Sequence, residues 1–129
     1  MNVREAGLER VRDAMITRPK TLPADATVGE LRRLLANSRL LTVLLVEGAT
    51  FAGAIEREDV GDELAPDAPA RLLAARDVET IGPDAPLGEA VERLDASGSR
   101  RLVVLDDDGT SLLGLLCLKG DRAGFCRSG

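Results

Sequence analysis

The chain carries two copies of one short sequence pattern, 59 residues apart. Residues 22–30 match residues 81–89, and the identical pairs are Asp25/Asp84, Ala26/Ala85, Gly29/Gly88 and Glu30/Glu89. Further along, the apolar run 43–47 aligns with 102–106 at the same offset, and 51–55 aligns with 112–116 at an offset of 61. A turn that is two residues longer in the second copy accounts for the change of offset. Three ordered matches with one loop-sized gap indicate a duplicated structural unit.

Each copy predicts the element order β-α-β-β-α, which places the chain in the α+β class. A short extended piece leads to a helix, whose start is marked by a Thr27-x-x-Glu30 capping box in the first copy and by Pro86 in the second. Two β-rich runs follow, and their continuous apolar character predicts strands buried on both faces. We expect a second helix over 57–64 and a shorter, glycine-broken piece after Lys119.

One copy alone is too small to be more than marginally stable, so the two should pack together. We expect a first domain over residues 1–64, a linker over 65–71 and a second domain over 72–129. The first fifteen residues predict a helix that packs across the pair, with Leu8, Val11 and Met15 on one side.

Composition excludes several classes of function. The sequence has no histidine, so it holds neither a Ser-His-Asp triad nor an imidazole metal site, and we predict no catalytic residue and no metal. Its formal net charge of −5 disfavours nucleic acid as a partner. No apolar stretch has the length of a membrane span, and the charged start does not resemble a secretory signal. Cys117 and Cys126 form no CxxC motif, and we expect a cytoplasmic protein with reduced thiols.

Several of these segments resemble the cystathionine-β-synthase (CBS) domain. They are 11–15, 21–30 and 53–60 in the first copy, with 99–109 and 114–119 in the second. The resemblance implies two CBS motifs that pair with pseudo-two-fold symmetry in a Bateman module, often as a homodimer. Such modules commonly bind AMP, ADP, ATP or S-adenosylmethionine in the cleft between the motifs and regulate an attached or partner protein.

The family's ligand motif is a glycine, two apolar residues, a threonine or serine, two further residues and an aspartate. Gly53, Ile55 and Asp59 fit it, which makes Asp59 the candidate to bind the ribose hydroxyls, although it could simply decorate a surface helix. Glu56 replaces the hydroxyl, and a carboxylate about 4 Å from a phosphate is repulsive by roughly 1–4 kcal/mol. Glu56 therefore favours adenosine or a sulfonium ligand over ATP. Arginines that could hold a phosphate elsewhere are Arg18, Arg39 and Arg57.

The second copy departs further from the motif. Cys117 replaces the hydroxyl, Gly120 replaces the aspartate, and Asp121 is one residue late, about 100° around a helix. This predicts a second site that is weak, altered or empty, with Cys117 a buried, inert thiol. Arg100 could reach a phosphate, although a solvated role is favoured, and Thr17 lies where family members contact the adenine chiefly through backbone. The acidic run 106–108 predicts a hairpin turn rather than a metal loop.

The leading hypothesis is a non-enzymatic regulatory module that binds an adenosyl ligand and acts on an effector protein in trans, with no required cofactor. Ligand binding would shift the population of one conformation, which the effector recognises. The alternative is an interaction or dimerisation module with degenerate ligand sites, favoured by Glu56 and Gly120.

Overall fold

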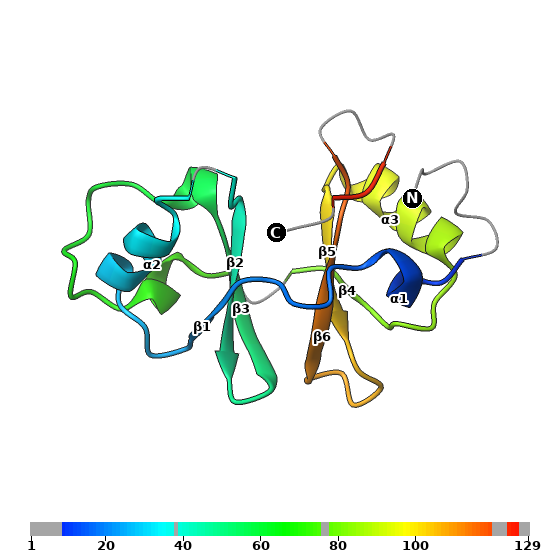
Figure 1. The fold of residues 1–129 in the computed structure, drawn as a ribbon, viewed down its shortest axis with the longest axis horizontal. Helices are drawn as coiled ribbons and strands as arrows, with labels where there is room; N and C mark the ends of the chain where they lie inside the picture. The colour runs from blue at the N-terminus through cyan, green and yellow to red at the C-terminus, as the bar shows by residue number, and fades with distance from the viewer. Residues whose placement is uncertain (1–8, 38, 76–77, 120–123, 127–129) are drawn as a thin grey trace. The chain divides into compact units, whose positions relative to one another are not determined.

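The structure is a computed structural model that describes residues 9–37, 39–75, 78–119 and 124–126 (Figure 1). The chain forms two compact units, and each contains one three-stranded sheet. The N-motif unit consists of the described residues of Pro19–Val78. The C-motif unit consists of those of Met1–Arg18 and Glu79–Ser128. Two small mixed sheets with few helices confirm the α+β class predicted from the repeat.

The N-motif unit has the strand order β1-β2-β3, with β1 parallel to β2 and β2 antiparallel to β3. Its elements are β1 (Thr21–Pro23), α2 (Val28–Leu34), β2 (Thr42–Glu47), β3 (Thr50–Glu56) and the short 3-10 turns η2 (Arg57–Asp59) and η3 (Ala70–Leu73). The capping box forms as predicted: Thr27 Oγ1 accepts a hydrogen bond from Glu30 N at 3.2 Å, and Thr27 N donates to Glu30 Oε2 at 3.4 Å.

The C-motif unit repeats this arrangement, with the order β4-β5-β6. Its elements are α1 (Val11–Ala14), β4 (Thr80–Ile81), α3 (Leu87–Ser97), β5 (Arg101–Leu105) and β6 (Leu112–Cys117). Figure 1 shows α2 and α3 each lying along one face of the sheet of its own unit. Their apolar stripes form the cores: Leu31 and Leu35 pack with Leu45, whereas Leu87 and Leu94 pack with Val104.

Each unit is completed by the segment that precedes the other motif, so the compact units differ from the expected domains 1–64 and 72–129. In the C-motif unit, Ile16 and Leu115 exchange backbone hydrogen bonds of 2.8 and 3.0 Å. In the N-motif unit, Ala75 and Ala54 exchange two of 2.9 Å. The expected linker 65–71 is part of this packing, because the carbonyl of Ala68 accepts a bond from the start of α2 and Ala70 is fully buried.

The expected helix over 57–64 is wrong beyond its first turn. After η2 the carbonyl groups of Gly61 and Leu64 accept hydrogen bonds from the Arg32 guanidinium at 2.9 and 2.8 Å. A side chain of α2 therefore takes these acceptors, and residues 60–64 follow an irregular path. Of the expected N-terminal helix, Val11–Ala14 is helical and belongs to the C-motif unit. Leu8, Gly120 and Asp121 lie outside the described residues.

Candidate functional site

The residues that match the ligand motif lie along β3 and η2 of the N-motif unit. Gly53 and Ile55 belong to β3, Glu56 ends it, and Asp59 ends the 3-10 turn that follows. Asp59 is exposed, and its carboxylate makes no hydrogen bond or ion pair with any residue that the structure describes. The structure therefore places Glu56 and Asp59 at and just after the C-terminal end of β3, with the Asp59 oxygens open to a hydrogen-bond donor.

Gly53 and Ile55 have structural roles at this strand. Gly53 has a φ of 157°, and a Cβ there would lie 2.9 Å from the Cβ of Ala74. The glycine thus permits the close approach of the 74–75 segment that pairs with β3. Ile55 is fully buried in the core of the unit, so its side chain faces away from solvent.

Glu56, which stands at the hydroxyl position of the motif, has a hydroxyl partner on the neighbouring strand. Thr42 is opposite Glu56 in the antiparallel register, and Thr42 Oγ1 donates a hydrogen bond to Glu56 Oε2 at 3.0 Å. Thr42 is 2% exposed, which makes it the one polar residue among the buried side chains that the structure describes. Sequence reasoning missed Thr42 because its relation to Glu56 depends on the strand register.

Arg57 holds the loop between α2 and β2 together. Its guanidinium donates to three backbone carbonyl oxygens, those of Leu35 and Asn37 at 2.6 Å and of Leu40 at 2.7 Å. These bonds satisfy carbonyl groups at and beyond the end of a helix, which have no partner within the helix. We therefore assign Arg57 a structural role. Arg39 is exposed in the loop that Arg57 holds.

The remaining candidates belong to the C-motif unit. Thr17 is exposed, whereas Arg100 is half-buried and its carbonyl accepts a hydrogen bond from Leu118 N at 2.7 Å. Gly114 matches Gly53 in role, since a Cβ there would lie 2.6 Å from the carbonyl oxygen of Ile16. The Gly120 position of the motif lies outside the described residues.

The expectation of reduced thiols is wrong, because Cys117 and Cys126 form a disulfide. Cys126 N donates to the Cys117 carbonyl oxygen at 2.7 Å, and the isolated bridge between Leu118 and Phe125 continues this pairing. The two Cα atoms are consequently 5.2 Å apart, a separation that a disulfide spans. Cys117 therefore occupies the hydroxyl position of the second motif as half of a disulfide.

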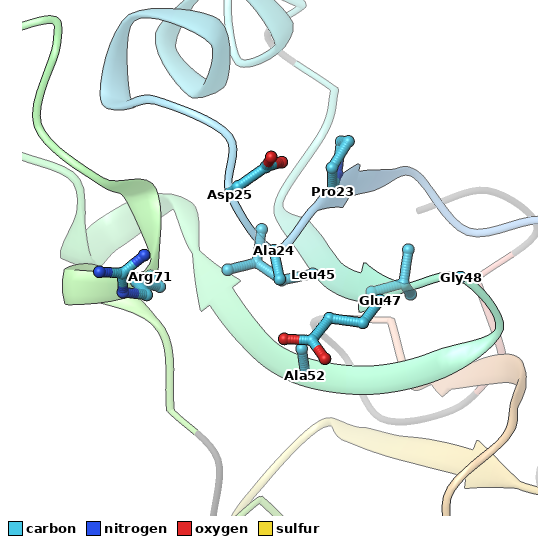
Figure 2. A pocket seen from close by; sticks show the side chains of 9 residues that line it. Pro23, Ala24, Asp25, Leu45, Glu47, Gly48, Ala52 and Arg71 are labelled. Atoms are coloured by element: carbon cyan, nitrogen blue, oxygen red, sulfur yellow. The ribbon is translucent and has the colours of Figure 1, made fainter.

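A cavity of about 420 Å³ lies at the other end of the N-motif sheet, where β3 begins. Asp25, Glu47 and Arg71 supply its charged lining, from the β1–α2 turn, the end of β2 and η3, and in Figure 2 the Arg71 guanidinium points away from the two carboxylates. Leu45 and Ala52 supply apolar surface. Sequence reasoning did not identify this cavity, although Asp25 belongs to the repeated segment.

The acidic turn of the C-motif unit is a hairpin turn, as predicted. Asp108 Oδ1 accepts backbone hydrogen bonds from Thr110 and Ser111, and its other oxygen accepts one from the Ser111 hydroxyl at 2.5 Å. These hydrogen bonds, of which the one from the Ser111 hydroxyl has the largest effect, lower the pKa of Asp108 from 3.8 to about 2.

Within the described ranges no three histidine, cysteine, aspartate or glutamate side chains form a metal cluster. Among the same residues, no helix combines the length and apolar character needed to cross a bilayer.

Comparison with known proteins gives one family and many similar structures. The family model of the CBS domain matches residues 11–65 and again residues 71–119. The "CBS domain protein PAE2072 from Pyrobaculum aerophilum complexed with AMP" is 25% identical, with a TM-score of 0.72 over 84% of this chain and 87% of that one.

Two further structures show the same fold at lower identity. A putative acetoin utilization protein from Vibrio cholerae is 23% identical, with a TM-score of 0.75 over 84% of each chain. The CBS domains of a transcriptional regulator from Streptococcus pneumoniae are 16% identical, with a TM-score of 0.74 over 85% of this chain and 93% of that chain. The search of curated proteins finds no match.

Proposed function

The chain belongs to the CBS domain family, and we propose that it is a non-catalytic regulatory module whose N-motif unit binds an adenosyl ligand. The observation that carries the proposal is the exposed Asp59, placed six residues after Gly53 at the end of a strand and turn that match the ligand motif. Its two oxygens can accept hydrogen bonds from adjacent ribose hydroxyls. The AMP complex of the Pyrobaculum aerophilum protein supports this ligand class.

Glu56 sets the preference among adenosyl ligands. Its half-buried carboxylate lies three residues before Asp59 and carries the hydrogen bond from Thr42. A phosphate about 4 Å from this carboxylate would be repelled by about 1 kcal/mol in water and by about 4 kcal/mol at the lower dielectric of a protein surface. The repulsion grows with the negative charge of the ligand. We therefore propose the affinity order S-adenosylmethionine and AMP above ATP.

The C-motif unit contributes differently to the proposal. The disulfide removes the Cys117 thiol from the position where the family motif has a hydroxyl. We propose that the working site uses Asp59 of the N-motif unit and that the second motif binds weakly or not at all. A homodimer and an effector protein acting in trans complete the proposal, and sedimentation at high protein concentration tests the dimer.

Thermal shift with a ligand panel tests the proposed function. The panel is AMP, ATP, S-adenosylmethionine and NADH, each at millimolar concentration. A ligand present at 100 times its Kd stabilises the folded state by about 2.7 kcal/mol, which raises Tm measurably. Glu56→Gln should raise the affinity for ATP about fivefold or more while changing that for S-adenosylmethionine little. If none of the four shifts Tm, the chain is an interaction module with degenerate ligand sites.

A further inference from the structure

The positions that line the cavity at the start of β3 have counterparts in the C-motif unit, because the repeat extends to the exchanged segments. Val28 N donates to the Ala68 carbonyl oxygen at 2.8 Å, and Leu87 N, 59 residues later, donates to that of Glu9 at 2.8 Å. The acceptors Glu9 and Ala68 are also 59 residues apart. Residues 68–75 therefore occupy the same place in the N-motif unit as residues 9–16 occupy in the C-motif unit.

This correspondence pairs each charged residue of the cavity with a charged residue of the other unit. Arg71 corresponds to Arg12, Asp25 corresponds to Asp84, and Glu47 corresponds to Asp106, each at an offset of 59. The sign of the charge is kept at all three positions. The two units thus carry the same electrostatic pattern at the same place in the fold.

In the C-motif unit these charges are satisfied within the protein. The Arg12 guanidinium forms an ion pair with Asp84, and Asp106 Oδ1 accepts a hydrogen bond from Asp107 N at 2.8 Å. The Arg10 side chain adds a hydrogen bond to the Asp84 carbonyl oxygen at 2.6 Å.

In the N-motif unit the same three positions are open. The side chains of Arg71, Asp25 and Glu47 are exposed and line the cavity of about 420 Å³. Their charged groups make no hydrogen bond or ion pair with any described residue. The volume is in the range of small-molecule sites. In the C-motif unit two of these charges therefore pair with each other and the third accepts a backbone hydrogen bond, whereas in the N-motif unit all three are open at a cavity.

The lining defines the chemistry of an occupant (Figure 2). Arg71 offers a planar guanidinium, which matches a carboxylate through two parallel hydrogen bonds. Asp25 and Glu47 offer acceptors for two ammonium groups. The buried Leu45, with Ala24 and Ala52, suits a short hydrocarbon chain between the charges. One positive and two negative side chains complement a ligand of net charge +1.

We propose that this cavity binds a diamino carboxylic acid of the size and charge of lysine. Its carboxylate contacts Arg71, and its two ammonium groups contact Asp25 and Glu47. The site is separate from the proposed adenosyl site, because the cavity lies where β3 begins and Asp59 follows the end of that strand. The proposal therefore stands or fails independently of adenosyl binding.

Titration of the isotopically labelled chain with L-lysine, followed by amide chemical shifts, tests the proposal. Saturable shifts are expected at residues 24–25, 45–48, 52 and 71. L-Norleucine, which lacks the side-chain ammonium, and cadaverine, which lacks the carboxylate, should each bind at least about tenfold more weakly at matched ionic strength. This comparison uses only the wild-type protein, so it does not depend on the folding of a variant.

Two matched substitutions complete the test. Arg71→Gln should weaken L-lysine binding about tenfold or more, whereas Arg12→Gln, at the ion-paired position of the other unit, should leave the affinity unchanged. Asp59→Asn should also leave it unchanged. The proposal is overturned if 50 mM L-lysine gives no saturable shifts at the cavity, if L-norleucine or cadaverine binds as well as L-lysine, or if Arg71→Gln retains the wild-type affinity.

Discussion

Breaking the disulfide should destabilise the C-motif unit by an amount set by the loop that it closes. Cys117 and Cys126 are nine positions apart, so the bond closes a loop of ten residues. The loop-entropy relation gives about 2.5–3 kcal/mol for a loop of this size at 25 °C. The pairing also holds Phe125, which is 4% exposed and belongs to the core that contains Leu94 and Leu116. Cys126→Ser should therefore lower the free energy of unfolding by about this amount.

Urea unfolding of the wild type and Cys126→Ser, each with and without dithiothreitol, measures this loss. Cys126 is half-buried, so the serine hydroxyl at this position can reach water. The variant should unfold at a lower urea concentration than the oxidised wild type, and dithiothreitol should shift only the wild type. Equal midpoints for the oxidised wild type and the variant, under oxidising conditions, would refute the reasoning.

Three further predictions concern other parts of the structure. Gly114→Ala places a Cβ 2.6 Å from the Ile16 carbonyl oxygen and should lower the free energy of unfolding, measured in urea, by about 1–3 kcal/mol. Gly88 has open space around it, so Gly88→Ala should not destabilise the protein. Equal effects of the two substitutions would argue against the pairing of Ile16 with Leu115. Arg57→Gln removes three hydrogen bonds from a charged donor and should cost at least about 1.5 kcal/mol in the same assay, and no loss would contradict its structural role. The Asp108 carboxyl should titrate near pH 2 by NMR. Because its folded pKa is below the unfolded value of 3.8, the stability it contributes should be present above pH 3.8 and be lost as the pH falls toward 2; a titration near 3.8 would contradict the hydrogen bonding of the turn.

The repeated unit could be predicted from the sequence because its signals are local. Continuous apolar runs predicted β2, β3, β5 and β6, the short extended pieces predicted β1 and β4, and the Thr27-x-x-Glu30 pattern predicted the start of α2. The helix expected over 57–64 failed for a non-local reason. Its carbonyl groups at Gly61 and Leu64 bind Arg32, which lies about 30 residues earlier in the chain. A sequence pattern indicates the secondary structure that a segment prefers. It does not show that a distant side chain will take the hydrogen-bond acceptors of that segment's backbone.

The exchange of segments between the motifs could not be predicted for a similar reason. The pairing of Ile16 with Leu115 is made by backbone groups, which leave no pattern in the side chains. Gly53 matches the ligand motif, yet its requirement for no Cβ, like that of Gly114, arises from the exchanged segments. The disulfide depends on the pairing of 117–119 with 124–126, which brings together two cysteines whose spacing alone indicates no bridge.

The candidate site was predictable only in its linear motif. The spacing from Gly53 to Asp59 identified the strand and turn, and the structure places Asp59 exposed at their end. The partner of Glu56 was not predictable, because Thr42 meets it through the register of β2 and β3. The structural role of Arg57 was also hidden, since its guanidinium reaches carbonyl groups about 20 residues earlier.

Isothermal titration of AMP into the wild type, Asp59→Asn and Glu58→Gln tests the central claim most directly. Asp59 and Glu58 are neighbouring exposed acids of η2, so both substitutions remove one negative charge from the same turn. Asp59→Asn removes a charged acceptor of hydrogen bonds, so it should bind AMP about tenfold or more weakly than the wild type. Glu58→Gln should bind AMP as the wild type does. Equal affinity in all three proteins, or no binding of AMP to the wild type, would contradict the account.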